Sequence, residues 1–156
     1  MRARFALTLV ASAVTATAVA GCSFTAEIAN LQPYDPSDGV ATTMDDIAVR
    51  NALLITGAGA EANLVMTVEN TTGESVDLRV QYGPNGARQT DIIVLPAEPE
   101  LFQVGSDPAN QLIISDEGII AGSLFPVYFQ HGDAQGEIIE VPVLDGTLAE
   151  YELLVP

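Results

Sequence analysis

Apolar and polar residues alternate without interruption along residues 76–82. A period of two residues is typical of a β-strand with one buried face. Residues 64–68 alternate in the same way, and the Asn-Thr-Thr-Gly turn at 70–73 predicts a hairpin that pairs these two strands. A second hairpin is expected at 83–86, leading into a strand over 91–95, because Asn-Gly readily adopts the positive φ angles of tight turns.

Further apolar runs are separated by turn-forming residues, and they cover 47–55, 101–104, 111–114, 124–129 and 138–143. About eight short strands, with turn signals every 8–12 residues or so, predict an all-β sandwich. Residues 148–154 fit either a last strand or a single helical turn. Pro126 and Pro142 interrupt apolar runs, and we expect both on edge strands or bulges because proline cannot donate a ladder hydrogen bond.

The amino terminus has the features of a secretory signal peptide: a basic start, an uncharged apolar run over 5–20 and small residues before Cys22. This order resembles the lipobox of bacterial lipoproteins, although Val19 stands where leucine is commonest. The resemblance implies cleavage between Gly21 and Cys22 and a diacylglycerol on the Cys22 thiol. Two or three acyl chains attach a protein durably, so we expect it at the extracytoplasmic face of the bacterial cell membrane.

Two alternatives to lipidation fit the same segment. Ordinary cleavage could follow the Ala-Val-Ala sequence at 18–20, and an uncleaved segment could remain as a membrane helix. The apolar run is shorter than the ~20 residues that a spanning helix usually needs. Cys22 is the one cysteine of the chain, so it leaves neither an intrachain disulfide nor a free thiol for catalysis.

Three segments follow from these patterns: a signal peptide over 1–21, a lipidated cysteine with a flexible stalk over 22–43, and one β-sandwich domain over 44–156. The stalk is expected because residues 23–43 have no clean periodicity and are rich in proline, glycine and small polar residues. The domain is long enough for one hydrophobic core and hardly for two.

Acidic residues dominate the charge. The 21 aspartates and glutamates all follow the signal peptide, where they face three arginines and no lysine, for a formal charge of −18. Such a surface repels nucleic acid and anionic lipid head groups. The excess charge favours solubility, and a cationic partner or a metal ion is the alternative.

Catalytic residues are scarce. His131 is the one histidine and lies in a Gly/Asp-rich turn, where we expect a surface-loop side chain. Ser123 and Asp133 are near in sequence, but no nucleophile-elbow motif surrounds Ser123. Acidic pairs that could hydrolyse glycosides arise by chance among 21 acids, and no tryptophan is present to line a sugar cleft. These pairs are Asp45-Asp46, Glu98 with Glu100, and Asp116-Glu117. We therefore expect no enzyme.

Acidic turns at 35–39 and 107–110 could supply some of the oxygens that calcium prefers. Neither turn has EF-hand spacing, and aspartate in a turn more often caps its own backbone. No glycine-rich phosphate loop is present, because the glycines at 57 and 59 precede no helical pattern. The sequence therefore predicts no resident cofactor.

The lipobox, the acidic stalk and the segments Asp-Ile-Ala-Val-Arg-Asn-Ala at 46–52 and Leu-Val-Met-Thr-Val-Glu-Asn at 64–70 resemble LpqE-like lipoproteins of high-GC Gram-positive bacteria. These in turn resemble the PCuAC copper-chaperone family. The resemblance implies an Ig-like antiparallel β-sandwich of about seven to nine strands.

The copper ligands of that family do not carry over. Its motif has a methionine 22 positions before a histidine and another two after it, which here are Ala109 and Asp133 around His131. Met44 and Met66 do not fit the motif either. The resemblance thus supports the fold and argues against copper.

Taken together, these features predict a non-catalytic lipoprotein that displays a protein-interaction domain to an envelope partner. The alternative is a lipoprotein that binds a metal or a small ligand through its acidic loops.

Overall fold

The computed structural model describes residues 37–57, 59–83, 88–109 and 111–156. Cys22, Gly21, the signal peptide and the stalk up to residue 36 lie outside the described residues. The chain divides into two compact units, and the described residues belong to the second, Asp35–Pro156. No described helix is long and apolar enough to cross a bilayer.

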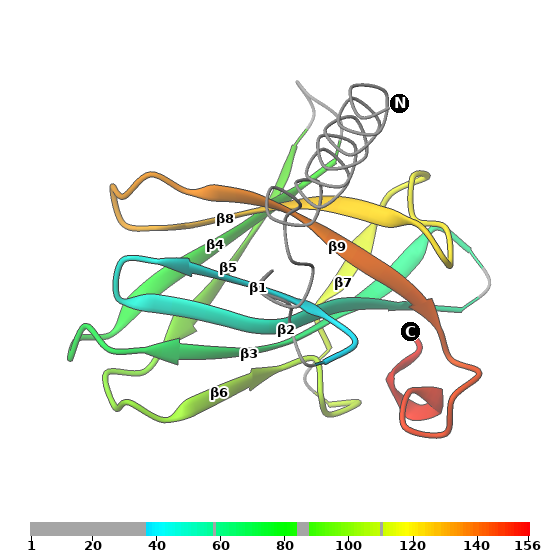
Figure 1. The fold of residues 1–156 in the computed structure, drawn as a ribbon, viewed down its shortest axis with the longest axis horizontal. Helices are drawn as coiled ribbons and strands as arrows, with labels where there is room; N and C mark the ends of the chain where they lie inside the picture. The colour runs from blue at the N-terminus through cyan, green and yellow to red at the C-terminus, as the bar shows by residue number, and fades with distance from the viewer. Residues whose placement is uncertain (1–36, 58, 84–87, 110) are drawn as a thin grey trace, which may run out of the picture. The chain divides into compact units, whose positions relative to one another are not determined.

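Nine strands and one short 3-10 turn make up the described part of the chain (Figure 1). Their bounds are β1 Val40–Met44, β2 Ile47–Thr56, β3 Glu61–Asn70, β4 Val76–Tyr82, β5 Gln89–Leu95, β6 Leu101–Val104, β7 Ile113–Ser115, β8 Leu124–His131, β9 Glu137–Asp145 and η3 Glu152–Leu154. The expected all-β sandwich is therefore confirmed. Residues 148–154 fit either a strand or a helical turn in the sequence, and the structure shows a 3-10 turn there and no strand.

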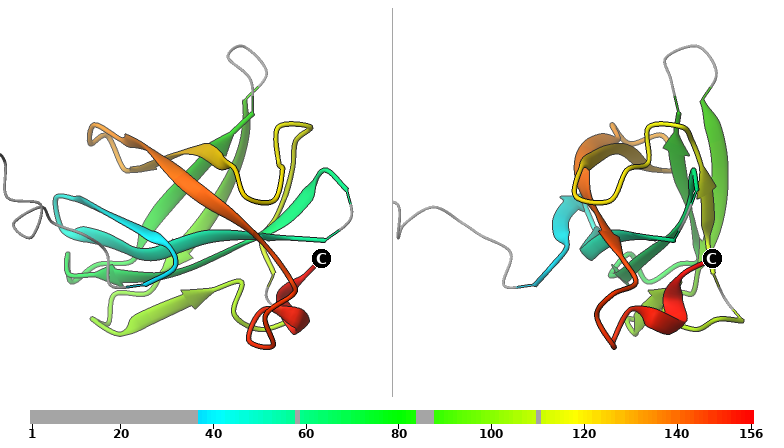
Figure 2. Two further views of the ribbon diagram at one scale, coloured as in Figure 1. Left: turned by 45° about the vertical axis from the view of Figure 1, so that its right-hand side comes forward. Right: turned by 90° about the vertical axis from the view of Figure 1, so that its right-hand side faces the viewer.

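Two sheets enclose the core. The first contains β1, β2, β3, β6 and β7, and the second has the order β5-β4-β8-β9. Neighbouring strands are antiparallel except where β9 runs parallel to β2, between Leu54↔Val143 and Thr56↔Asp145. This parallel pairing joins the sheets along one side and makes the sandwich barrel-like, as the two further views show (Figure 2).

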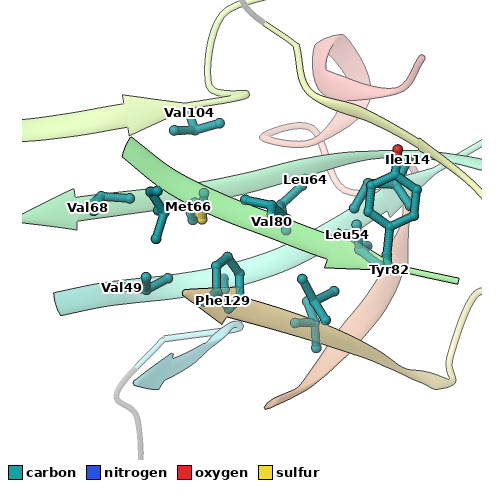
Figure 3. Close-up of a cluster of buried hydrophobic side chains, with 14 of the residues drawn as sticks. Val49, Leu54, Leu64, Met66, Val68, Val80, Tyr82, Val104, Ile114 and Phe129 are labelled. Atoms are coloured by element: carbon teal, nitrogen blue, oxygen red, sulfur yellow. The ribbon is translucent and has the colours of Figure 1, made fainter. Parts of the chain in front are cut away.

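The inward faces of both sheets supply the core (Figure 3). Val80 and Phe129 are fully buried partners on β4 and β8, and they face Leu64 and Met66 of β3 across the sandwich. The alternation of residues 76–82 therefore marks a strand with one buried face, as predicted, since Leu78, Val80 and Tyr82 point inward.

A bulge in β2 changes which residues of this strand point inward. The register with β3 shifts between Arg50 and Leu53, and Asn51 adopts a positive φ of 50°. Val49 points into the core before the shift and Leu54 after it, because the extra residue reverses the alternation. This is why the sequence over 47–55 shows an apolar run without a clean period.

The expected hairpin at 70–73 is wrong. β3 pairs with β2, β6 and β7, whereas β4 pairs with β5 and β8, so the turn crosses from one sheet to the other. Asn70 is buried, and its amide nitrogen donates to the carbonyls of Glu74 and Pro96. The Asn-Thr-Thr-Gly sequence forms a turn as expected, but the partner of the following strand is decided by packing. The expected pairing of β4 with β5 is confirmed by an uninterrupted register, and residues 84–87 of the predicted turn lie outside the described residues.

The expected stalk boundary is also wrong at its end. Residues 40–43 belong to β1, which pairs with β2 from Val40↔Ala52 to Met44↔Ile47. Gly39 is packed there too, because its N–H donates to Asn51 Oδ1 at 2.9 Å and a Cβ on it would lie 2.5 Å from the Asn51 carbonyl carbon. Small polar residues such as these give a strand little periodic signal.

The two prolines lie on inner strands and not on edge strands. Pro126 in β8 pairs with Glu140 of β9, but the pairing of β8 with β4 begins only at Tyr128. Pro142 in β9 pairs with Leu124, and the pairing with β2 begins at Val143. Each proline therefore occupies a stretch with one strand partner, which is where a missing N–H costs nothing.

Candidate functional site

Two connections come together at one end of the sandwich: the one between β2 and β3, of which residues 57, 59 and 60 are described, and the loop at 116–123 between β7 and β8 (Figures 1 and 2). The N–H of Asp116 donates to the carbonyl of Ala60 at 2.9 Å, which ties the two connections together. The Asp116 carboxylate accepts the N–H of Gly118 at 2.7 Å, so this loop begins with an Asx turn.

Three hollows adjoin one another at this end, and we call them the loop-end groove. The central one, of about 500 Å³, is lined by Gly83, Asp116, Glu117, Gly118, Leu124, Phe125 and Pro126. The next, of about 540 Å³, shares Asp116 and Glu117 with it and adds Glu61. The third, of about 360 Å³, shares Gly83 and Pro126 with it and reaches Arg88, Tyr128 and Glu140.

The chemistry of the groove changes along its length. Glu61, Asp116 and Glu117 give one end a negative charge, and Leu124 and Pro126 give the middle an apolar floor. Leu124 is 62% exposed, although it begins the inner strand β8. At the other end the Arg88 guanidinium lies 5.8 Å from the centre of the Tyr128 ring, within the range of a cation–π interaction.

Tyr82 supports the arginine end from inside the sheet. Its hydroxyl lies 2.9 Å from Asp91 Oδ2 and 3.2 Å from Gln89 Oε1, both on the neighbouring strand β5. Burial raises the pKa of Tyr82 to about 12, and the hydrogen bond to Asp91 and the charge of that carboxylate add to the effect. Tyr82 is thus a neutral hydrogen-bond donor and not a base at physiological pH.

His131 is not a surface-loop residue. It is the last residue of β8, half-buried, and pairs with the buried Leu78. Its Nε2 is buried and has no hydrogen-bond partner among the residues that the structure describes. The Gly/Asp-rich turn begins one residue later, so the composition of the turn concealed the end of the strand.

A serine–histidine pair is excluded by the length of β8. Ser123 immediately precedes this strand and His131 ends it, which places them roughly 25 Å apart at the rise of an extended chain. The Ser123 hydroxyl instead donates to the carbonyl of Ile120 at 2.7 Å. Asp133 lies beyond His131 and therefore also far from Ser123.

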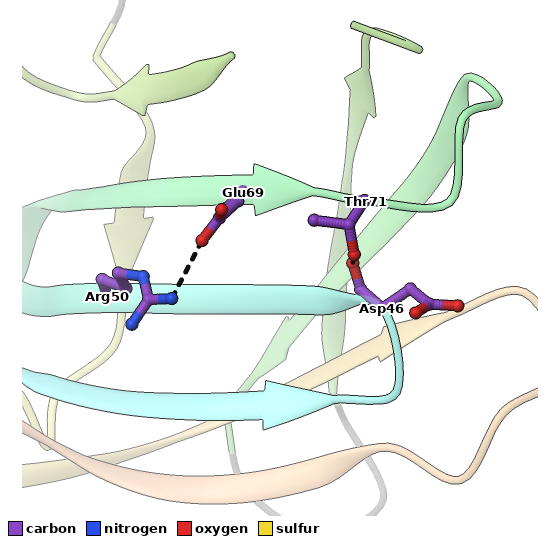
Figure 4. A network of polar contacts seen from close by, with 4 residues as sticks. All are labelled: Asp46, Arg50, Glu69 and Thr71. Carbon is purple, nitrogen blue, oxygen red and sulfur yellow. Dashed lines mark hydrogen bonds and ion pairs between the residues drawn. The ribbon is translucent and has the colours of Figure 1, made fainter. Parts of the chain in front are cut away.

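The three acidic pairs considered from the sequence lie on three separate connections. Asp45 and Asp46 form the turn between β1 and β2, where the Asp46 carbonyl accepts hydrogen bonds from the N–H and the hydroxyl of Thr71, both at 2.9 Å (Figure 4). Glu98 and Glu100 lie between β5 and β6. Of these pairs, Asp116 and Glu117 alone line the loop-end groove.

The two turns considered for calcium serve structural roles where they are described. The Asp38 carboxylate accepts a hydrogen bond from the Tyr151 hydroxyl, and the Asp107 carboxylate accepts the N–H of Ala109 at 2.8 Å. Met44 and Met66 are buried in the core. Across the described ranges, no three side chains of histidine, cysteine, aspartate or glutamate gather as a metal site would require.

The fold has a counterpart among solved structures. The apo PCuAC domain of PmoF2 matches with a TM-score of 0.50 and 20% sequence identity, over 70% of this chain and 98% of that domain. The chain has a PCuAC-like fold. The copper-bound PCuAC domain from PmoF2 matches with a TM-score of 0.49 and 19% identity, over 68% of this chain and 98% of that domain. No protein-family model and no curated protein matches the sequence.

Sequence reasoning found Asp116 and Glu117 but not the groove that they line. Leu124 and Pro126 belong to an apolar run in the sequence, which predicts burial and not a groove floor. Arg88 directly precedes β5 and Tyr128 lies in β8, so no local motif joins them. The sequence contains one indirect sign of the groove. A proline within an apolar run, such as Pro126, indicates that its strand lacks a neighbour on one side at that point.

Proposed function

We propose that the protein is a lipid-anchored, non-catalytic interaction module of the bacterial envelope, which binds its partner in the loop-end groove. The signal peptide and the cysteine at position 22 support the anchor. The observation that carries the interaction is the groove itself, which joins an exposed apolar floor to carboxylates at one end.

The groove favours an extended segment that carries both apolar and basic side chains. Leu124 and Pro126 can bury apolar groups, and Glu61 and Glu117, both exposed, can pair with a lysine or arginine. The excess of acidic residues in the chain attracts such a partner from a distance. Because Asp116 ties the two connections together, this end of the groove is preformed.

Site-specific photo-crosslinking in growing cells tests the groove. A photoreactive residue at Leu124 should give a discrete crosslinked envelope protein, and the double variant Glu61→Gln/Glu117→Gln should weaken that product. The control position is Leu101 on β6, which is 63% exposed against 62% for Leu124 but lies on the other sheet. Equal products from both positions, or none from Leu124, would contradict the proposed groove.

The anchor is tested separately by metabolic labelling with a fatty acid. The wild-type chain should take up the label and fractionate with membranes, and Cys22→Ser should lose both properties. Label that persists in Cys22→Ser would place the acylation elsewhere. The groove and the anchor can therefore fail independently.

The second candidate is a metal- or small-ligand-binding lipoprotein. Its support is that Asp116 and Glu117 line two adjoining hollows and that the solved structure with a similar fold is a PCuAC domain. Calorimetric titration with Ca²⁺ and then with Cu(I) tests it. Saturable heat that Glu117→Gln abolishes would favour this candidate, and the absence of heat with either ion would remove the metal form of it.

A further inference from the structure

Strand edges differ in how well they are protected from pairing with another chain. Natural sheets protect an edge by keeping it short, by bulges, or by proline and lysine. β6 has four residues and β7 has three, and β1 has a register shift between Val40 and Thr42. These three edges of the first sheet are therefore protected.

The edge strand β5 of the second sheet is neither short nor bulged nor interrupted by proline, and its one charged side chain, Asp91, accepts a hydrogen bond from Tyr82 of its own subunit. It has seven residues, no proline and no lysine, and its register with β4 runs without a shift from Val76↔Leu95 to Tyr82↔Gln89. Within the described ranges β4 is the one strand that pairs with β5. Ile92 and Val94 project from its outer face and are 58% and 63% exposed.

We propose that β5 pairs with β5 of a second copy of this chain, antiparallel about a two-fold axis at Ile92. The two second sheets would then form one continuous sheet across the dimer. Ile92 is the middle residue of Gln89–Leu95, so this register pairs all seven residues of each strand. This inference depends neither on the lipid anchor nor on what the groove binds.

The side chains of β5 are self-complementary in this register. On the outer face Ile92 meets Ile92 of the partner subunit, and Thr90 meets Val94 on either side. Cross-strand pairs of β-branched residues stabilise antiparallel sheets. Asp91 meets Ile93 and not a second carboxylate, whereas a two-fold axis at Asp91 would oppose two like charges.

The charged groups beside β5 also permit this pairing. The Asp91 carboxylate is occupied within its own subunit by the Tyr82 hydroxyl. On β4, Arg79 lies opposite Ile92 and Asp77 lies opposite Val94. In each subunit, charges of both signs therefore lie one strand away from the new seam. A second copy is thus the occupant for which the chain itself supplies the complementary strand.

Net charge opposes the association and gives it a characteristic salt dependence. Both subunits are strongly acidic, so they repel one another at low ionic strength. Added salt screens this repulsion, and we expect dimerisation to strengthen with salt. Association with a basic partner would instead weaken as salt is added, because salt screens the attraction between opposite charges.

Sedimentation of the processed chain, residues 22–156 with Cys22→Ser, tests the dimer, because this form has neither an acyl chain nor the apolar segment over 5–20. We expect a monomer–dimer equilibrium that persists in Ile138→Lys and is lost in Ile92→Lys, which would oppose two like charges at the axis. The control is matched, because Ile138 is 56% exposed on the outer face of β9, in the same sheet but away from β5. A monomer at all concentrations, or a dimer that survives Ile92→Lys, would overturn the proposal.

Disulfide crosslinking gives a second measurement that does not depend on a destabilising change. In the same cysteine-free background, Ile92→Cys should oxidise to a covalent dimer, because residues directly opposite on antiparallel strands lie within disulfide reach. Ile138→Cys should remain monomeric. Equal crosslinking of both variants would indicate random collisions and would also overturn the proposed axis.

Discussion

Part of the outer face of the first sheet is covered by the carboxyl-terminal segment, whereas the outer face of the second sheet carries exposed apolar side chains. Leu53 and Ile55 of β2 point away from the main core but are 1% and 0% exposed. Ile92, Val94, Leu124 and Ile138 of the second sheet are 56–63% exposed.

The covering segment is held by buried polar contacts. Asn63 lies opposite Ile55 on this outer face, and its amide nitrogen donates to the carbonyls of Gly105 at 2.8 Å and Leu154 at 3.0 Å. Its side-chain oxygen accepts the N–H of Leu112 at 3.2 Å. The same kind of apolar residue is therefore core on one sheet and free surface on the other, and the difference is what the chain places above it.

The largest expected effect comes from the matched pair Ile55→Ala and Ile92→Ala. Ile55→Ala should lower the free energy of unfolding by about 2–5 kcal/mol, because it leaves a cavity under the covering segment. Ile92→Ala removes the same atoms from a largely exposed side chain and should change stability by about 0.5 kcal/mol or less when the protein is monomeric. Urea unfolding at low protein concentration measures both, and similar losses would show that the two faces do not differ.

A smaller effect is expected from Asn63→Ala. The change leaves the carbonyls of Gly105 and Leu154 and the N–H of Leu112 without this partner, and a buried group so left costs about 1–3 kcal/mol. Binding of a hydrophobic dye should rise as the covering segment loosens. Gln103→Ala, at an exposed position of β6, is the control and should leave both readouts unchanged.

The smallest effect compares two tyrosines by titration: Tyr82 on the core side of β4 in the second sheet, and Tyr151 in the carboxyl-terminal segment. The pKa values of Tyr82 and Tyr151 are both raised to about 12, for Tyr82 mainly by burial and for Tyr151 mainly by its hydrogen bond to Asp38. Asp38→Asn should therefore return the pKa of Tyr151 most of the way to 10.0, and Asp91→Asn should leave the pKa of Tyr82 well above that value. Absorbance of the tyrosinate form follows both titrations.

The sign of the accompanying change in stability follows from linkage. Between pH 10 and pH 12 the unfolded chain releases the tyrosine protons that the folded chain retains, so stability falls as the pH rises through this window. Tyr82→Phe and Tyr151→Phe should each make this fall shallower. An unchanged slope in both variants would contradict the raised pKa values.

The sequence by itself determined the fold class and most of the strands. Strands over 76–82 and 101–104 have the predicted bounds, and the other main runs differ by one to three residues at their ends. Period-two alternation and turn residues are local signals, and they depend on the pleat of a single strand. The signal peptide and Cys22 are sequence signals of the same local kind, and they remain predictions.

Only the tertiary structure decided how the strands are partnered and which apolar residues are covered. The turn at 70–73 has the same local chemistry whether the chain pairs back or crosses to the other sheet, so the hairpin prediction was wrong. The loop-end groove is lined by Glu61 of β3, Asp116 of the loop after β7 and Pro126 of β8. Their spacing along the chain does not predict that they line the same groove. Ile55 and Ile92 look alike in sequence, because burial is a property of the segment packed above a residue and not of the residue itself.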